Sequence, residues 1–223
     1  MSKTQYISRK GNFDSGHRVM NEFMKCFNIH GHTYLYELTF SFENMEEIGY
    51  AIDFKEIKRV FCQWIDDVLD HGMLLNPHDT KLIETTKDYG TKLWLMSLNG
   101  EGEYCNPSVE NIAREVFLAM DILTTILYRN ASTGLKIHRV TIYETPNCLT
   151  EVKAASITDN ERNNFIKARW KEISDYAKEK GVLEYDDRKI NKHLKTEDLL
   201  TKKYVSRRDD EGAEDWANHL KNK

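Results

Sequence analysis

Three histidines near the start of the chain have a spacing that could hold a metal ion. His30 and His32 are separated by one residue, and residues two apart in an extended chain point to the same side. His17 lies upstream, in the segment FDSGHR. Three imidazoles with no fourth protein ligand would leave one metal position open to water or a substrate, as in catalytic zinc sites. The pattern predicts a metal site at His17, His30 and His32, and imidazole ligands favour zinc.

Cys26 lies four residues before His30 and has two alternative roles at such a site. A nearby metal ion or cation lowers the pKa of a thiol, which makes the thiolate available as a base or a nucleophile. The thiolate could instead be a fourth ligand, which would close the site and make it structural. The residue pattern leaves both roles open.

Two further groups of residues could transfer protons or bind a ligand. Asp70 and His71 are adjacent, and a carboxylate beside an imidazole can fix its tautomer and raise its basicity. The alternative for this pair is a favourable interaction with a helix carboxyl end. Glu144 is in phase with Val140 and Ile142, so it should be buried and needs a partner. That partner is an arginine or a ligand with two parallel N–H donors.

Hydrophobic periodicity predicts an α+β domain, with an antiparallel four-stranded sheet and two helices on one of its faces. Residues 32–42 alternate as a half-buried strand does. Apolar residues recur at helical spacing over residues 54–69 and 108–128. Asp53 is the expected cap of the first helix, and Pro107 suits the start of the second, where Glu110 in the first turn is favoured by the helix dipole. The other predicted strands cover residues 6–9, 93–98 and 135–144.

Composition limits the classes of function. The 223 residues carry a formal net charge of -4, so no basic field predicts a nucleic-acid partner. No apolar run is long enough to span a bilayer, and the first residues lack the apolar core of a signal peptide. We therefore expect a cytoplasmic protein without a membrane partner. The four cysteines include no C-x-x-C pair, and free thiols are expected.

A boundary is predicted near residue 155. In residues 155–223, 31 of the 69 residues are charged, a density nearly twice that of residues 1–154. We interpret residues 1–154 as one domain and residues 155–223 as a mainly helical extension. A helix capped by Asp159 or Asn160 and ending near Gly181 is expected, followed by a polar segment with weak signals.

Six sequence boxes together resemble the 6-pyruvoyltetrahydropterin synthase superfamily, which has the tunnelling fold. The resemblance covers residues 5–152. Three residues separate Cys26 from the His-Gly-His sequence. This spacing resembles that of the bacterial 6-carboxytetrahydropterin synthases of queuosine and 7-deazapurine biosynthesis. The boxes are Phe13 to His17, Cys26 with His30-Gly31-His32, Asp53-Phe54-Lys55, Asp70-His71 with Leu75-Asn76, Asn106 to Asn111, and Tyr143-Glu144-Thr145.

The resemblance implies a zinc-dependent lyase. It would convert 7,8-dihydroneopterin triphosphate to 6-carboxy-5,6,7,8-tetrahydropterin and release acetaldehyde and triphosphate. It also implies a homo-oligomer, a hexamer or tetramer, that closes its sheets into a barrel with active sites between subunits. Two alternatives stay open: triphosphate elimination to 6-pyruvoyltetrahydropterin, and a non-catalytic protein that binds zinc or pterin.

The resemblance also implies roles for single residues. Cys26 would be the general base, and Asp70 and His71 would relay protons. In the oligomer, this pair could act at the zinc site of a neighbouring subunit. Glu144 would accept two N–H groups of the pterin. The box around residue 108 would add substrate contacts from Ser108 and Glu110, although Ser108-Val109 replaces a more usual threonine-rich pair.

Overall fold

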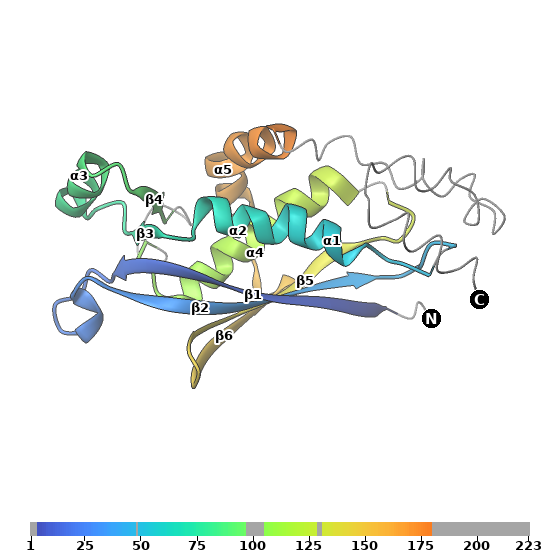
Figure 1. Cartoon of the computed structure of the whole chain (residues 1–223), viewed down its shortest axis with the longest axis horizontal. Coiled ribbons are helices and arrows are strands. Elements are labelled where there is room, and N and C mark those ends of the chain that lie inside the picture. The colour runs from blue at the N-terminus through green and yellow to red at the C-terminus, as the bar shows by residue number, and fades with distance from the viewer. Residues whose placement is uncertain (1–3, 48, 97–104, 129–130, 180–223) are drawn as a thin grey trace, which may run out of the picture.

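A six-stranded mixed sheet forms the centre of the computed structural model, which describes residues 4–47, 49–96, 105–128 and 131–179 (Figure 1). The strand order is β4-β3-β1-β2-β5-β6. The pairs β1–β2, β2–β5 and β5–β6 are antiparallel, whereas β3 pairs parallel with both β1 and β4. The expectation of an antiparallel four-stranded sheet is therefore wrong, while the mixed α+β class is confirmed. The strands are β1 (Gln5–Arg18), β2 (His30–Phe42), β3 (Gly72–Leu75), β4 (Lys92–Leu95), β5 (Lys136–Thr145) and β6 (Cys148–Lys153).

The long hairpin of β1 and β2 sets the register of the histidines. His17 pairs with His30 and Ser15 pairs with His32, so all four side chains point to the same face of the sheet. The sequence predicted only residues 6–9 of β1, because glycine and small polar residues in the rest of the strand are typical of turns. One of them, Gly11, is needed there, because a Cβ at this position would lie 2.3 Å from the hydroxyl oxygen of the buried Tyr36.

Two helices cover one face of the sheet, as predicted (Figure 1). The first is continuous from α1 (Phe54–Glu56) through a π-helical segment (Ile57–Cys62) to α2 (Gln63–Val68). Asp53 caps it, since its carboxylate accepts a hydrogen bond of 2.8 Å from the amide of Lys55. The second is α4 (Val109–Tyr128), most of whose residues are buried.

Three elements gave no clear signal in the sequence. Strand β3 has only four residues and is mostly buried, so it has no alternating pattern. Helix α3 (Thr80–Asp88) buries only Ile83 and Thr86, which form no apolar stripe. In β6 only Val152 is buried. The predicted strand over residues 93–98 corresponds to β4, but residues 97–104 lie outside the described part of the chain.

Helix α5 (Asp159–Glu179) begins the C-terminal extension and packs on the outside of α4 (Figure 1). Phe165, Ile173 and Ala177 are fully buried in the same hydrophobic core as the sheet and the other helices. The cap of α5 is Thr158, not Asp159 or Asn160, because its hydroxyl accepts from the amide of Glu161 at 3.2 Å. The division at residue 155 stays a prediction, and residues 182–223 lie outside the described residues.

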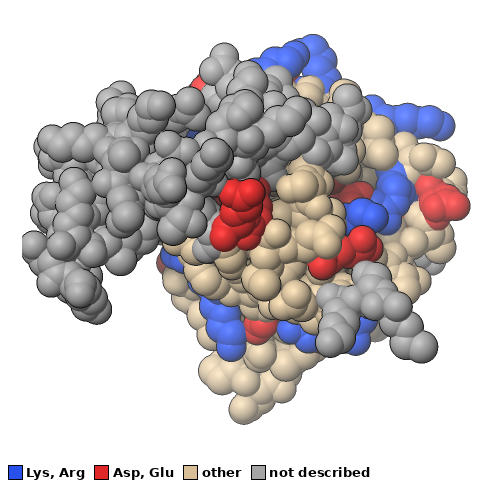
Figure 2. All heavy atoms as spheres, turned by 90° about the vertical axis from the view of Figure 1, so that its right-hand side faces the viewer, with Lys and Arg blue, Asp and Glu red and all other residues tan. Residues whose placement is uncertain are grey.

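Charged side chains of both signs are interspersed on the described part of the face shown in Figure 2. This distribution agrees with the small net charge of -4 and gives no continuous basic surface on that face. Among the described helices, none combines the length and apolarity that a bilayer crossing requires. All four cysteines are free thiols, as predicted.

Candidate active site and metal centre

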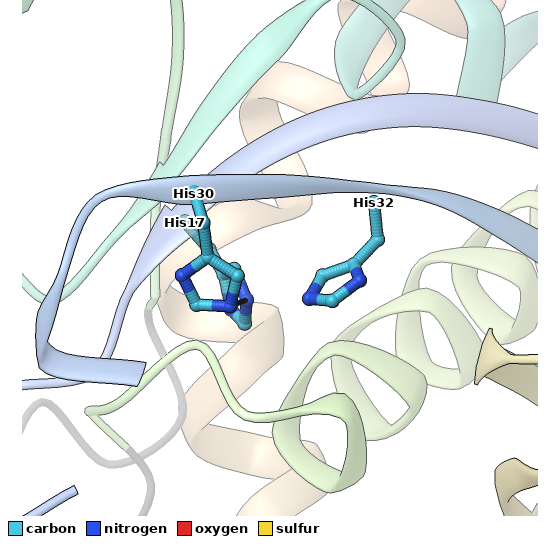
Figure 3. Close-up of side chains that lie close together, drawn as sticks. All are labelled: His17, His30 and His32. Atoms are coloured by element: carbon cyan, nitrogen blue, oxygen red, sulfur yellow. Dashed lines mark hydrogen bonds between the residues drawn. The ribbon is translucent and has the colours of Figure 1, made fainter. Parts of the chain in front are cut away.

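The structure brings the three predicted histidines together on the helix-covered face of the β1–β2 hairpin. Their rings project to the same side of the two strands (Figure 3). One ring nitrogen from each lies within 4.8 Å of those of the other two. The Nε2 atoms of His17 and His30 are 3.0 Å apart. His17 is 1% exposed, and the other two are partly buried. This group is the metal candidate that the spacing predicted.

The backbone fixes which nitrogen of two of these rings faces the centre. Nδ1 of His17 donates to the carbonyl of Pro107, and Nδ1 of His30 donates to the carbonyl of Asn28, both at 2.7 Å. With Nδ1 protonated, a neutral ring keeps an unprotonated Nε2. Hydrogen bonds from the second ring nitrogen orient metal-binding imidazoles in this way in many proteins.

Two observations indicate that the group fits a metal ion. The lone pairs of the Nε2 atoms of His17 and His30 face each other at 3.0 Å, which is favourable only with a proton or a cation between them. Burial lowers the pKa of His17 despite the opposing effect of its bond to Pro107, and the neighbouring His30 lowers it further, which disfavours the extra proton. In addition, Nε2 of His32 is buried and lacks a hydrogen-bond partner in the described structure. A metal ion would satisfy all three nitrogens.

Glu144 lies beside the histidines and is only partly buried, whereas its phase along β5 predicted a buried side chain. Its Oε1 is 3.8 Å from Nε2 of His17 and 3.8 Å from Nε2 of His32. Its side chain is 21% exposed. Next to it, the hydroxyl of the fully buried Tyr34 has no hydrogen-bond partner within the described residues. Burial, with the nearby charges of Glu144 and Cys26, raises the pKa of Tyr34, so this hydroxyl stays protonated.

Cys26 occupies a short 3-10 turn, η1 (Lys25–Phe27), between β1 and β2. Its side chain is half-buried. The ligand atoms of His17, His30 and His32 form one close group and those of Asp14, Asp70 and His71 form another, and the Cys26 thiol belongs to neither. The geometry therefore places Cys26 near the start of the strand that carries His30 and His32, but outside the group of ligand atoms.

Asp70 and His71 form a separate group at the turn between α2 and β3. Nδ1 of His71 donates to Asp70 at 2.6 Å, and the other carboxylate oxygen of Asp70 accepts from the amide of Asp14 at 2.7 Å. Burial opposes ionisation of Asp70, but these two bonds outweigh it and lower the pKa of the carboxyl. Asp70 therefore fixes the His71 tautomer, leaving Nε2 as the acceptor nitrogen of a side chain that is 75% exposed.

The Asp70–His71 pair faces the opposite side of the sheet from the three histidines. It is bonded to Asp14, whose carboxylate also accepts from the hydroxyl of Thr33 at 2.5 Å. Asp14 and Thr33 alternate with the inward-facing residues of β1 and β2, so they point away from the helix layer. An open hollow beside the pair is lined by Asp14, Thr33 and His71 and also by Ser15 and His32. Within one chain the structure therefore does not bring the pair to the metal candidate.

The remaining predicted substrate contacts lie at the start of α4. Ser108 precedes the helix, and its carbonyl accepts from the amide of Ile112 at 2.9 Å. It directly follows Pro107, whose carbonyl binds His17. Glu110 is exposed in the first turn. Sequence reasoning did not find Pro107 or Asn28 as histidine partners, because backbone carbonyls carry no residue-type signal.

Together the mixed sheet, the helices on one of its faces and the convergent histidines form a candidate metal site in an α+β domain. The sequence model described as 6-pyruvoyl tetrahydropterin synthase matches residues 6–155. The chain therefore belongs to the 6-pyruvoyl tetrahydropterin synthase family, a family of enzymes. This confirms the resemblance read from the six boxes.

Individual relatives have names for both pterin products. The chain is 31% identical to a 6-carboxy-5,6,7,8-tetrahydropterin synthase of Rickettsia bellii over 146 residues, which cover 65% of this chain and 97% of the relative. It is 26% identical to a 6-pyruvoyl tetrahydrobiopterin synthase of Dictyostelium discoideum, with coverages of 58% and 98%. Among solved structures, 6-pyruvoyl tetrahydropterin synthase of Caenorhabditis elegans aligns with a TM-score of 0.45 and 20% identity, covering 68% of this chain and 96% of that one.

Proposed function

We propose that the protein is a zinc-dependent 6-carboxytetrahydropterin synthase. It would convert 7,8-dihydroneopterin triphosphate to 6-carboxy-5,6,7,8-tetrahydropterin with release of acetaldehyde and triphosphate, in queuosine and 7-deazapurine biosynthesis. The observation that carries the proposal is the convergence of His17, His30 and His32 beside Glu144, close along the chain to the Cys26 turn. Supporting it, a relative with that name is 31% identical and matched over 97% of its length.

His17, His30 and His32 would hold the zinc ion through Nε2. Bound zinc would polarise the side-chain hydroxyls of the substrate and lower their pKa. The Cys26 thiolate would take a proton from the substrate side chain as general base. Glu144 would accept hydrogen bonds from two N–H groups of the pterin ring. Its Oε1 lies 3.8 Å from Nε2 of both His17 and His32, too far for a hydrogen bond to either histidine. Ser108 and Glu110 would add contacts at the start of α4.

His71 would act on the active site of a neighbouring copy. The pair it forms with Asp70 lies on the opposite face from its own chain's histidines, and 75% of its side chain is exposed. We therefore propose a homo-oligomer, a hexamer or tetramer, whose sheets close into a barrel so that His71 reaches a second copy's substrate. Asp70 would hold the His71 tautomer, leaving Nε2 to accept and return a proton.

Zinc-loaded protein incubated with 7,8-dihydroneopterin triphosphate tests the reaction. Acetaldehyde and 6-carboxytetrahydropterin are the expected products, and Cys26→Ala should lower kcat by at least about 100-fold, the lower end of the usual range for a lost general base. Full turnover by Cys26→Ala, or no turnover by the wild type, would contradict the proposal. A product with the mass of 6-pyruvoyltetrahydropterin would instead establish the alternative elimination.

Mixing two inactive variants tests the shared site. Cys26→Ala subunits keep His71, and His71→Ala subunits keep Cys26. If one site takes residues from two copies, refolding the two variants together should restore part of the activity, because some sites combine both intact residues. A mixture that stays as inactive as its components would show that each chain completes its own site.

A further inference from the structure

The turn that carries Cys26 has little burial to hold it in place. None of the residues of η1 is buried, so apolar packing fixes the turn only weakly. Its position depends instead on hydrogen bonds to the end of β1. The amide of Val19 donates to the carbonyl of Cys26 at 2.9 Å.

Arg18 makes the principal side-chain contact with this turn. Its Nε donates to the carbonyl of Phe27 at 2.9 Å, and its guanidinium carbon lies 4.1 Å from the centre of the Phe27 ring. Arg18, the last residue of β1, and Val19, which follows it, thus bind consecutive carbonyls of the turn. Because Arg18 also directly follows His17, one short stretch of backbone supports both a metal-candidate ligand and the turn.

Asp79 holds the guanidinium of Arg18 in this orientation. Nη1 of Arg18 lies 3.2 and 3.0 Å from the two carboxylate oxygens of Asp79. The Asp79 side chain is only 5% exposed, so its charge needs a cation. Asp79 also occupies the cap position of α3, yet its carboxylate makes no capping bond there. An aspartate at that position ordinarily stabilises its own helix, and here its carboxylate binds Arg18 instead.

We propose that Arg18 and Asp79 form a positioning pair that fixes the Cys26 thiol relative to the three histidines. The inference rests on the proposed role of Cys26 as general base. Neither residue of the pair touches the substrate; together they hold the turn against β1. A catalytic group displaced by about 1 Å can lose about 100-fold in rate, so loosening the turn should lower kcat more than it changes KM.

Three substitutions test the pair. Arg18→Gln removes the charge and the fork of donors, Arg18→Lys keeps the charge without the fork, and Asp79→Asn keeps the shape of the side chain without its charge. Matched controls are Lys171→Gln and Asp175→Asn, which break an ion pair on α5 whose side chains are 91% and 48% exposed. Each protein is compared for zinc content, kcat, KM and amide hydrogen exchange over residues 19–29.

In Arg18→Gln we expect kcat to fall about 10- to 100-fold, with KM within about threefold of the wild type and zinc content unchanged. Arg18→Lys and Asp79→Asn should show smaller losses in kcat. The amides of Phe27 and Asn28, which close the turn, should exchange faster in all three variants, while the controls match the wild type.

Unchanged exchange and unchanged kcat in Arg18→Gln and Asp79→Asn would overturn the proposal. So would loss of zinc, or of the whole fold, in both variants, because the pair would then support the structure in general. If Arg18→Gln alone does not fold, Asp79→Asn decides. Exchange does not depend on turnover, so it tests the pair even if the wild type proves inactive on the pterin and the proposed reaction fails.

Discussion

Replacing Glu161 by glutamine should weaken the attachment of α5 to α4. One oxygen of the Glu161 carboxylate accepts from Nε and Nη2 of Arg114, at 2.8 and 2.5 Å. The other accepts from the amide and the hydroxyl of Thr158, both at 2.8 Å. The Glu161 side chain is 3% exposed, so these four bonds replace its hydration. Glutamine has the same shape, but its neutral amide accepts from fewer donors and lacks the charge.

The size of the effect follows from the number and kind of bonds lost. A hydrogen bond to a charged group contributes about 1.5–3 kcal/mol, and removing one partner of a buried ion pair costs about 3–5 kcal/mol. Arg114 is 21% exposed and can turn to water, which favours the lower values. We expect Glu161→Gln to lower the free energy of unfolding by about 2–3 kcal/mol. The melting temperature should fall by about 4–12 °C, at about 2–4 °C per kcal/mol for a chain of this size.

The pH dependence of this loss has a definite sign. Burial opposes ionisation of Glu161, but the bonds from Thr158 and Arg114 outweigh it and lower the pKa of the carboxyl. A lowered pKa in the folded state stabilises the protein fully above the unfolded value of about 4.3, and the contribution is lost as the pH falls through the folded value. The stability difference between wild type and Glu161→Gln should therefore be complete at pH 7 and shrink below about pH 4.

Urea denaturation from pH 7 down to the lowest pH at which the wild type stays folded measures this difference. The control is Glu172→Gln on the same helix, whose side chain is 51% exposed and paired with Arg169; it should change stability by less than about 0.5 kcal/mol. A loss below about 0.5 kcal/mol in Glu161→Gln at pH 7, or a loss that does not shrink in acid, would refute the reasoning.

Two further predictions concern the hairpin and the metal centre. Gly11→Ala should destabilise the protein by about 1–3 kcal/mol, because the new Cβ meets the Tyr36 side chain, which is 3% exposed and has little room to move. Thermal denaturation measures this, with Asn12→Ala at the exposed neighbouring position as the control. Equal melting temperatures for the two variants would contradict the prediction. His32→Ala should bind no zinc at zinc concentrations that saturate the wild type. Zinc at 100 times its dissociation constant should stabilise the folded wild type by about 2.7 kcal/mol, and His32→Ala should lack this stabilisation. Metal analysis and melting curves with and without zinc check this, with His78→Ala as the control, and one equivalent of zinc retained in His32→Ala would rule it out.

The sequence was most informative where side-chain type and backbone period coincide. Alternation in β2 predicted both its buried face and the common side of His30 and His32. The phase of β5 indicated that Glu144 points inward, but not that it lies beside the histidines. The same reasoning could not find β3, because a short strand buried in the sheet has no period to detect. It also could not show that Asp70 and His71 face away from the histidines, since that depends on how the turn after α2 meets β1.

The interactions that organise the site were less predictable than its residues. The hydrogen bond from His17 to the Pro107 carbonyl joins positions 90 residues apart, and neither residue type predicts it. Asp79 read alone is a good helix cap, yet its carboxylate is bound to Arg18. Long-range hydrogen bonds of this kind are set by tertiary structure, which overrides local preference.

His71 has a φ angle of 56°, in the left-handed region. This backbone conformation costs a residue with a Cβ about 1–2 kcal/mol, whereas glycine adopts it freely. The conformation is held by the amide of His71, which donates to the carbonyl of Asp14 at 2.6 Å. Folding alone would favour glycine here, but glycine has no imidazole. At position 71, glycine would therefore give the more stable chain, but only histidine supplies the imidazole.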